Sequence, residues 1–266
     1  MEKLYTKQMK VPNVAVDCFG RLKPSMLLFY CQDIAGHHCT HLGTDYDTLA
    51  HRNLFWAVIR QEVAGEHSEL LGASNGEYNG RQLFWAVTRH RVEIKRLPGA
   101  KEVITLKTWP CPTTRVAYPR ATVAYDEEGN ELFKCMSLWV LMDVSSRAMI
   151  LPGKSGVTVD GITLGGELAA PGSLVPVAGE NREMRQVRFT DLDVNGHMNN
   201  TQYLTWVEDL LPVSHHKDHP AKAFTVCYLS EALEGQTLEL HWSLGEDLQV
   251  DAKSEDRRIF AAKVTY

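Results

Sequence analysis

The feature that most constrains the fold of this chain is an internal repeat that relates its two halves. Four residues near the N-terminus match four in the last third at a constant offset of 176, the pairs being Asp17/Asp193, Gly20/Gly196, Leu28/Leu204 and Asp33/Asp209. In both places a strand pattern leads into a turn with glycine and then into a helical segment. A repeat of this length is one structural unit used twice, so we expect two related α+β units in tandem.

A second match, at an offset of 133, aligns residues 92–109 with residues 225–242. Both stretches alternate apolar and polar residues as half-buried strands do, with a turn between them. Between the halves, Leu151 to Met184 is rich in Gly and Pro and lacks a sustained helical or strand pattern, which is typical of a linker that crosses the surface. We therefore expect a first unit at residues 1–152, a linker at 153–184 and a second unit at 185–266.

A shorter repeat lies inside the first unit, where residues 32–60 are followed at once by a similar copy at residues 61–89. Thirteen pairs of residues are identical without a gap, and both copies contain the run Leu-Phe-Trp-Ala-Val, from Leu54 and from Leu83. This predicts the duplication of a helix-plus-strand piece. The sequence leaves open which copy fills the original place in the unit.

The overall composition bounds the class of protein. A chain of 266 residues with 44% hydrophobic residues can bury a core, and its net charge of −5 argues against a nucleic-acid binder that neutralises phosphates. The N-terminal segment has no basic stretch followed by an apolar core, and no apolar run reaches the roughly 20 residues of a membrane helix. Six cysteines without CxxC spacing are typical of reduced thiols. We therefore expect a cytoplasmic protein without a membrane span.

The repeat in the last third carries a polar cluster, DLDVNGHMNN, at residues 191–200. Its simplest interpretation is an Asn-Gly turn followed by a helix N-cap at Asn199, Asn200 or Thr201. A plain turn does not need polar side chains at every second position, as in Asp193, Asn195 and His197. On extended backbone this spacing places the three side chains on one face, next to the unpaired N–H groups of a helix N-terminus, which suits an acyl-transfer or acyl-hydrolysis site.

The stretch DLDVNGHMNNTQYLTWVED closely resembles the active-site segment of the acyl-acyl carrier protein (acyl-ACP) thioesterases, a double-hotdog family. Its pattern, Asp-x-Asn-x-His-x-Asn-Asn-x-x-Tyr, is met by Asp193, Asn195, His197, Asn199, Asn200 and Tyr203. The resemblance extends to the Gly-Arg-Leu turn at Gly20, the LFWAV strand, KTWP at Lys107 and SLWVLMD at Ser137, and the duplicated 29 residues depart from it. It implies two tandem hotdog units, each an antiparallel sheet wrapped around a central helix.

The resemblance also implies a catalytic set. A Glu three residues after a Tyr matches Tyr228-Leu-Ser-Glu231, so the catalytic residues would be Asp193, Asn195, His197 and Glu231. Ala232 stands where the family commonly has Cys, which leaves attack by water activated by Glu231 and His197. Substrate or oxyanion positioning is implied for four further residues, Gly196, Met198, Asn199 and Asn200. The implied substrate is acyl-ACP, with neither a cofactor nor a metal.

The first unit lacks this set. At the matched positions Asn195 corresponds to Phe19, His197 to Arg21, and Glu231, at the offset of 133, to Pro98. If these residues only formed a turn, both halves would be expected to keep them. We therefore expect chemistry in the second unit, and scaffold and acyl-chain pocket in the first.

Other polar clusters have competing interpretations. The stretches HHCTH (residues 37–41) and HHKDH (residues 215–219) have metal-like i, i+4 spacing, but they lack recognised partners, so solvated or capping histidines are favoured. A basic run, Arg182, Arg185 and Arg188, is compatible with docking of an acidic carrier protein and equally with an ordinary solvated surface.

Three functions fit this sequence. The first is hydrolysis of acyl-ACP thioesters, the second is the same chemistry on acyl-CoA, and the third is a non-catalytic acyl-binding regulator. The double unit and the Asn, His and Glu set favour the first. The sequence leaves a homodimer open, and it does not determine the preferred acyl chain length.

Overall fold

The computed structural model of the chain describes residues 3–41, 55–56, 77–78, 81–143 and 146–266. The first unit contains a central helix and five long strands, namely β1 (Tyr5–Lys10), α1 (Pro24–His41), β4 (Arg81–Ile94), β5 (Val103–Pro110), β6 (Tyr118–Tyr125) and β7 (Glu131–Asp143). The second unit has the same plan, namely β9 (Asn181–Gln186), α4 (Asn200–Glu208), β10 (Ala223–Tyr228), β11 (Thr237–Leu244), β12 (Asp247–Ser254) and β13 (Arg257–Thr265).

Shorter elements lie between these. They are the 3₁₀ turns η1 (Asn13–Ala15) and η2 (Phe189–Asp191), the strands β2 (Phe55–Trp56), β3 (Glu77–Tyr78) and β8 (Met149–Ile150), and the helices α3 (Pro152–Ser155) and α5 (Val213–Asp218).

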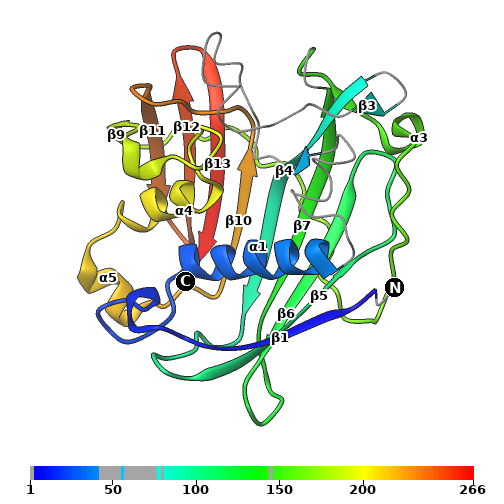
Figure 1. The fold of residues 1–266 in the computed structure, drawn as a ribbon. Helices are drawn as coiled ribbons and strands as arrows, with labels where there is room; N and C mark the ends of the chain where they lie inside the picture. The colour runs from blue at the N-terminus through cyan, green and yellow to red at the C-terminus, as the bar shows by residue number, and fades with distance from the viewer. Residues whose placement is uncertain (1–2, 42–54, 57–76, 79–80, 144–145) are drawn as a thin grey trace.

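In the described part of the chain, ten strands of the two units form one continuous sheet with the order β1-β5-β6-β7-β4-β10-β13-β12-β11-β9 (Figure 1), and the short strands β2, β3 and β8 pair with β4 or β7 beside this path. In each half the strands follow the same order from the edge to the centre. The two halves meet where β4 and β10 pair in antiparallel fashion, for example at His90 and Val226. This topology confirms the predicted α+β class and the use of one structural unit twice.

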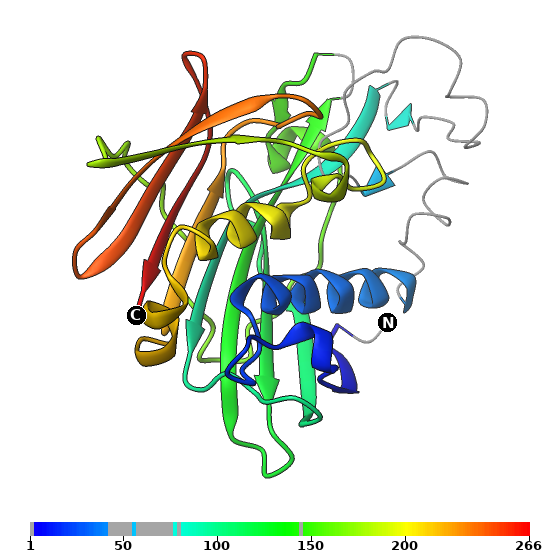
Figure 2. The same ribbon diagram turned by 90° about the vertical axis from the view of Figure 1, so that its left-hand side faces the viewer.

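The two central helices lie on the same face of the sheet, which bends around them (Figure 2). One hydrophobic core joins them to both halves of the sheet, and its buried members include Leu28 and Ile34 of α1 and Leu204 and Val207 of α4. Leu204 and Val207 are three positions apart and so share one face of α4, as expected of an amphipathic helix packed on a sheet. The core is therefore continuous across the boundary between the units.

The stretch predicted as a linker crosses the outer face of the first unit's half of the sheet. Ile162 and Leu168 pack against a cluster around Trp109, and Val157 and Val159 pack against a second cluster. The last four residues of the predicted segment 153–184 belong to β9, which begins at Asn181. The division of the chain into units at these residue numbers stays a prediction.

The 29-residue duplication falls largely on residues 42–54 and 57–76, which lie outside the described residues. In the described part, Gln32 to His41 of the first copy belong to α1, and the LFWAV run of the second copy belongs to β4. The short strand β2, from the first copy, pairs in parallel with the same residue types of the second copy, Phe84 and Trp85. The unit thus takes its helix from the first copy and its long strand from the second.

Across the described ranges, every helix is too short or too polar to cross a lipid bilayer.

Candidate active site

The turn that opens the polar cluster is built on Asp193. One carboxylate oxygen, Oδ1, accepts the backbone N–H of Asn195 (2.8 Å) and of His197 (3.3 Å), and the Asp193 N–H donates to the carbonyl of His197 (2.7 Å). Gly196 takes a left-handed backbone conformation with φ of 75°, which favours glycine. The other carboxylate oxygen, Oδ2, faces the side-chain amide of Asn195 (3.4 Å). Asp193 therefore holds the turn and orients the two residues that follow it.

His197 and Glu231 lie together although they are 34 positions apart. His197 forms an antiparallel bridge with Leu233, and the N–H of Met198 donates to the carbonyl of Ala232 (2.9 Å). This places His197 Nε2 3.7 Å from Glu231 Oε2, with the imidazole 3% exposed and the carboxylate 17% exposed. That distance is longer than a direct hydrogen bond, and one water molecule lying beside the pair could contact both groups.

Arg147, a residue that the sequence analysis missed, completes this group from the other unit. Its Nη1 donates to Glu231 Oε1 at 3.2 Å, and its guanidinium lies 5.5 Å from the ring centroid of Phe84. Arg147 sits in the turn between β7 and β8 with φ of 55°, in a loop held by Asp143, whose Oδ1 accepts the N–H of Ser146 (2.8 Å). The candidate site is thus shared by both units.

The electrostatics of the group favour a neutral imidazole beside a carboxylate. Burial, helped by the Arg147 guanidinium, lowers the pKa of His197 to about 4. Burial raises the pKa of Glu231 above its ordinary value, while Arg147 and Arg257 oppose this shift. The pKa of Asp193 is also raised by burial, against the hydrogen bonds of its turn. A neutral His197 at neutral pH has a nitrogen that can accept a proton.

The predicted positioning residues follow at the start of α4. Met198 is buried in the core, and Asn199 caps the helix by accepting the N–H of Thr201 (2.9 Å). Asn200 is buried, and its carbonyl accepts the hydroxyl of Tyr228 (3.0 Å). Its side-chain Nδ2 has no hydrogen-bond partner among the described residues. A buried amide donor without a partner is a candidate for a substrate oxygen.

The three arginines of the basic run do not share one surface. Arg182 is 70% exposed and contacts Glu239 (3.4 Å), whereas Arg185 is on the opposite face of β9 and pairs with Glu183 and with Asp209 on the helix side. Arg188, after the strand, is exposed. Arg182 and Arg188 are therefore exposed to solvent, whereas Arg185 is engaged in ion pairs with Glu183 and Asp209 of the same chain.

The hydrogen bonds at the equivalent turn of the first unit correct one assignment. There the N–H of Leu22 donates to the carbonyl of Pro98 (2.8 Å), as Met198 does to Ala232. Pro98 therefore corresponds to Ala232, and the predicted match of Pro98 with Glu231 is wrong by one residue. The true offset in this region is 134.

The residue equivalent to Glu231 is thus Leu97, which is again apolar. The predicted offset of 133 matched Trp109 with Trp242. The structure places Trp109 in the cluster covered by the linker, while Trp242 packs against the main core. A slip of one residue moves a side chain to the other face of a strand, so two tryptophans on opposite faces cannot be equivalent.

The two histidine clusters make protein contacts. His38 is buried, with its Nδ1 3.1 Å from Arg120 Nη1, and its ring stacks on Tyr5. In the second cluster, His216 Nε2 lies 2.8 Å from the carbonyl of Glu208, and His215 stacks on His219. Over the part of the chain that the structure describes, no three His, Cys, Asp or Glu side chains are grouped in a way that could hold a metal ion.

Two solved structures with a similar fold are acyl-ACP thioesterases. An acyl-ACP thioesterase from Bacteroides thetaiotaomicron superposes with a TM-score of 0.79 at 21% identity, covering 99% of this chain and 97% of that one. The 12:0-ACP thioesterase from Umbellularia californica gives a TM-score of 0.76 at 19% identity, covering 100% and 97%. These likenesses confirm the predicted tandem hotdog fold.

Curated relatives are similar in sequence over part of their length. Dodecanoyl-[acyl-carrier-protein] hydrolase of Umbellularia californica is 27% identical over 166 residues, which cover 55% of this chain and 41% of the relative. Palmitoyl-acyl carrier protein thioesterase of Gossypium hirsutum is 27% identical over 158 residues, covering 56% and 38%. The matched region therefore spans about two fifths of these chloroplastic relatives.

Two sequence models of one family match the chain in succession. The acyl-ACP thioesterase N-terminal domain matches residues 57–151, and the acyl-ACP thioesterase C-terminal domain matches residues 176–264. Together they cover more than half of the chain and reproduce its two-unit order. The chain belongs to the acyl-ACP thioesterase family.

Proposed function

We propose that this protein hydrolyses acyl-ACP thioesters to a free fatty acid and holo-ACP. The observation that carries this proposal is that buried His197 lies 3.7 Å from the partly buried Glu231, whose carboxylate also pairs with Arg147 of the first unit. The family membership of the chain supports the reaction class. We propose the division of labour accordingly: residues 1–152 form the scaffold and acyl-chain pocket, residues 153–184 join the units, and residues 185–266 carry the chemistry.

The proposed nucleophile is a water molecule that lies beside Glu231 and His197 and contacts both. Glu231 or the neutral His197 takes one proton as the water oxygen bonds to the thioester carbonyl carbon. The carbonyl oxygen becomes an oxyanion, and the C–S bond then breaks as the tetrahedral intermediate collapses. The proton moves to the departing pantetheine sulfur, which leaves as a thiol. Thioesters are activated, so a positioned water suffices without a covalent intermediate.

Three further side chains have proposed supporting roles. Asn195, oriented by Asp193, is a donor for the substrate carbonyl, and the unpaired Nδ2 of buried Asn200 is a second donor for the oxyanion. Asp193 acts by positioning, because its two oxygens already accept hydrogen bonds from the turn. Arg147 keeps Glu231 oriented and favours its ionised form.

A carrier-docking role is proposed for the exposed arginines Arg182 and Arg188. Carrier proteins are acidic, so exposed guanidinium groups near the site would raise the rate of encounter and make it salt-dependent. Arg185 contributes less to such a surface, because Asp209 and Glu183 already pair with it. The cytoplasmic location and a homodimer stay predictions from the sequence.

The test of this function compares two substrates that differ only in the carrier. The protein is assayed with the same acyl group on ACP and on CoA, and the released thiol and fatty acid are both measured. We expect a higher kcat/KM for acyl-ACP. A preference for acyl-CoA would favour the acyl-CoA thioesterase, and binding of both without turnover would favour an acyl-binding regulator.

A further inference from the structure

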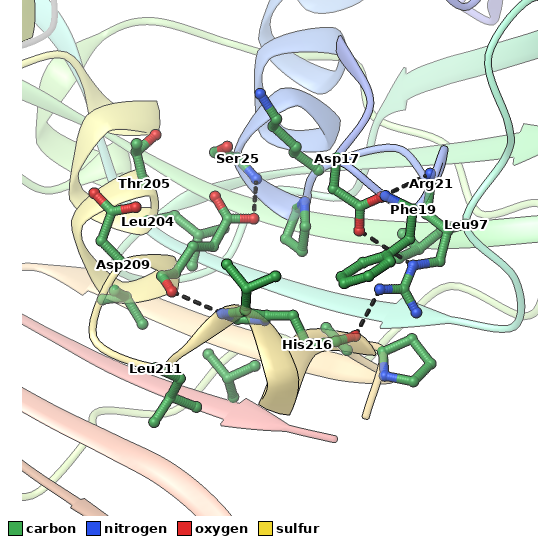
Figure 3. Close-up of a pocket in the computed structure, with 18 of the residues that line it drawn as sticks. Asp17, Phe19, Arg21, Ser25, Leu97, Leu204, Thr205, Asp209, Leu211 and His216 are labelled. Atoms are coloured by element: carbon green, nitrogen blue, oxygen red, sulfur yellow. Dashed lines mark hydrogen bonds and ion pairs between the residues drawn. The ribbon is translucent and has the colours of Figure 1, made fainter. Parts of the chain in front are cut away.

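A cavity of about 510 Å³ lies between the two units, away from the candidate active site (Figure 3). Its first wall is the turn at Asp17 to Arg21 and the start of α1. Its second wall is the C-terminal half of α4 together with α5. None of Asp193, Asn195, His197 and Glu231 lines this cavity.

The cavity occupies the place in the first unit that the candidate active site occupies in the second. The lining residues Asp17, Phe19, Arg21 and Leu97 stand at the positions of Asp193, Asn195, His197 and Glu231, as the matched hydrogen bonds establish. The duplicated fold therefore contains two equivalent places at the boundary between its units. The place in the first unit lines a cavity, and it carries apolar or internally paired side chains where the second unit has Asn195, His197 and Glu231.

The lining of this cavity is mainly apolar. Its apolar side chains come from both units and include Met26, Leu97, Leu204, Val207, Leu211 and Val264. A volume of this size lies within the range of small-molecule sites, which are typically apolar with a few polar groups. The lining thus suits a long apolar chain.

Several charged groups around the cavity are paired. Asp17 pairs with Arg21 (3.1 Å), and Asp209 pairs with Arg185 (3.3 Å). Glu208 Oε1 accepts the N–H of Ser25 at 3.4 Å. Burial raises the pKa of Glu208 to about 7, against the hydrogen bonds from Ser25 and the nearby charge of Lys23. The lining carboxylates Asp17, Glu208 and Asp209 outnumber the lining cations Arg21 and Lys23, which favours a neutral chain over a free fatty carboxylate.

We propose that this cavity is a second, non-hydrolysing site for an acyl-pantetheine thioester chain. The substrate class rests on the proposed function. The acyl group fills the apolar lining, the Glu208 carboxylate accepts an amide N–H of the pantetheine arm, and the Lys23 ammonium donates to a carbonyl of the arm.

Hydrolysis is absent at this site because Arg21 and Leu97 stand where the second unit has His197 and Glu231. Arg21 is fastened to α5, where its Nη2 donates to the carbonyl of His216 (2.6 Å) and its Nη1 to that of Lys217 (3.3 Å). Its guanidinium lies 4.8 Å from the ring centroid of Phe19. Leu97 has no atom that can take a proton. A chain bound here is held and released unchanged.

The test counts bound chains by isothermal titration calorimetry. The probe is dodecyl-pantetheine thioether, in which a methylene replaces the thioester carbonyl so that hydrolysis cannot occur. We expect two probe molecules per wild-type chain and one per chain in Leu97→Trp, which fills the cavity. Val213→Trp is a second filling variant at an exposed lining residue of α5, and it too should bind one. The matched control Val116→Trp, at an exposed position outside the lining, should bind two.

One bound probe in the wild type, or two in both filling variants, would overturn the inference. Acyl-ACP hydrolysis is measured on the same wild-type preparation, so the two proposals can fail separately. Two bound probes without hydrolysis would contradict the proposed function alone, and hydrolysis with one bound probe would contradict the second site alone. Repeating the titration with the probe on ACP and on CoA identifies which carrier can deliver its chain to the cavity.

Discussion

Two turns in this chain, one beginning at Asp17 and the other at Asp193, have the same backbone and different side chains. In both, the aspartate N–H donates over 2.7 Å to the carbonyl four residues later, and the glycine has a φ of 78° (Gly20) or 75° (Gly196). In both, the aspartate Oδ1 accepts the N–H two residues later at 2.8 Å. The turn itself needs only the aspartate and the glycine.

The difference lies in the side chains placed on this common backbone. The second turn presents a buried imidazole to a carboxylate, whereas the first presents a guanidinium that is bound to its own aspartate and to α5. A matched position in the first unit therefore exists for Asp193, Asn195, His197 and Glu231. At these matched positions the fold is the same and the proposed chemistry is absent. Substitutions made in such pairs separate catalytic effects from effects on the fold.

The largest expected effect comes from removing the charge of Glu231. Glu231→Gln should lower kcat for acyl-ACP by about 10³-fold, within the range for general acid–base groups. Leu97→Gln, at the matched position, should change kcat by less than about threefold. Steady-state hydrolysis of acyl-ACP checks both, and circular dichroism verifies that both variants are folded. If Glu231→Gln and Leu97→Gln lost kcat equally, the Glu231 carboxylate would have no direct role in the reaction.

The next effect comes from truncating the aspartate of each turn. The two truncations should lower the stability of the protein equally, but they should differ in their effect on turnover. Asp17→Ala and Asp193→Ala should each lower the free energy of unfolding by about 1–3 kcal/mol, because each removes a charged acceptor from two backbone N–H groups. Only Asp193→Ala should also lower kcat strongly. Urea unfolding and hydrolysis assays give the two readouts. Strong loss of stability in one variant alone would mean that the two turns are not equivalent.

A smaller effect is expected from Arg147, the contact that the first turn lacks. Arg147→Ala should lower turnover at pH 7 about tenfold, the rate equivalent of about 1.4 kcal/mol. Arg147→Lys should recover part of the loss. Arg96→Ala, which removes an exposed ion pair with Glu102, is the matched control and should leave turnover within about twofold. If Arg147→Ala, Arg147→Lys and Arg96→Ala had the same turnover, Arg147 would have no role in the reaction.

The pH dependence of turnover follows from the same contact. The active form has neutral His197 and ionised Glu231, so activity is lost as the pH falls and either group is protonated. The pKa of His197, lowered to about 4 by burial and Arg147, predicts that its protonation limits turnover only near pH 4 and not near pH 6.5. Arg147 lowers both pKa values, so Arg147→Ala should move the acid limb to higher pH. A limb that stays in place would contradict this coupling.

The features that the sequence predicted correctly are local or repeated. The turn at Asp193, a helix cap at Asn199, Asn200 or Thr201 (Asn199 in the structure) and the two-unit order follow from short motifs and from one constant offset. Local motifs work here because the backbone bonds of a turn or cap join residues two to four positions apart.

The features that the sequence did not predict depend on contacts between distant segments. Arg147 reaches Glu231 across 84 positions and from the other unit, and a lone arginine in a turn carries no motif. The match of Pro98 with Glu231 failed because the sequence alignment, which paired Trp109 with Trp242, was one residue out of register. Such a slip places matched residues on opposite faces of a strand. The second cavity depends on packing of α4 and α5 against the first turn, which no local pattern specifies.

The most direct test of this account compares His197→Ala with Arg21→Ala, the same truncation at equivalent positions of the two turns. The measurement is kcat for acyl-ACP hydrolysis, with both variants shown to be folded by circular dichroism. The account predicts a loss of at least about 10²-fold for His197→Ala and a change of less than about threefold for Arg21→Ala. Similar values in the two variants, or near wild-type turnover in His197→Ala, would contradict the assignment of the chemistry to the second turn.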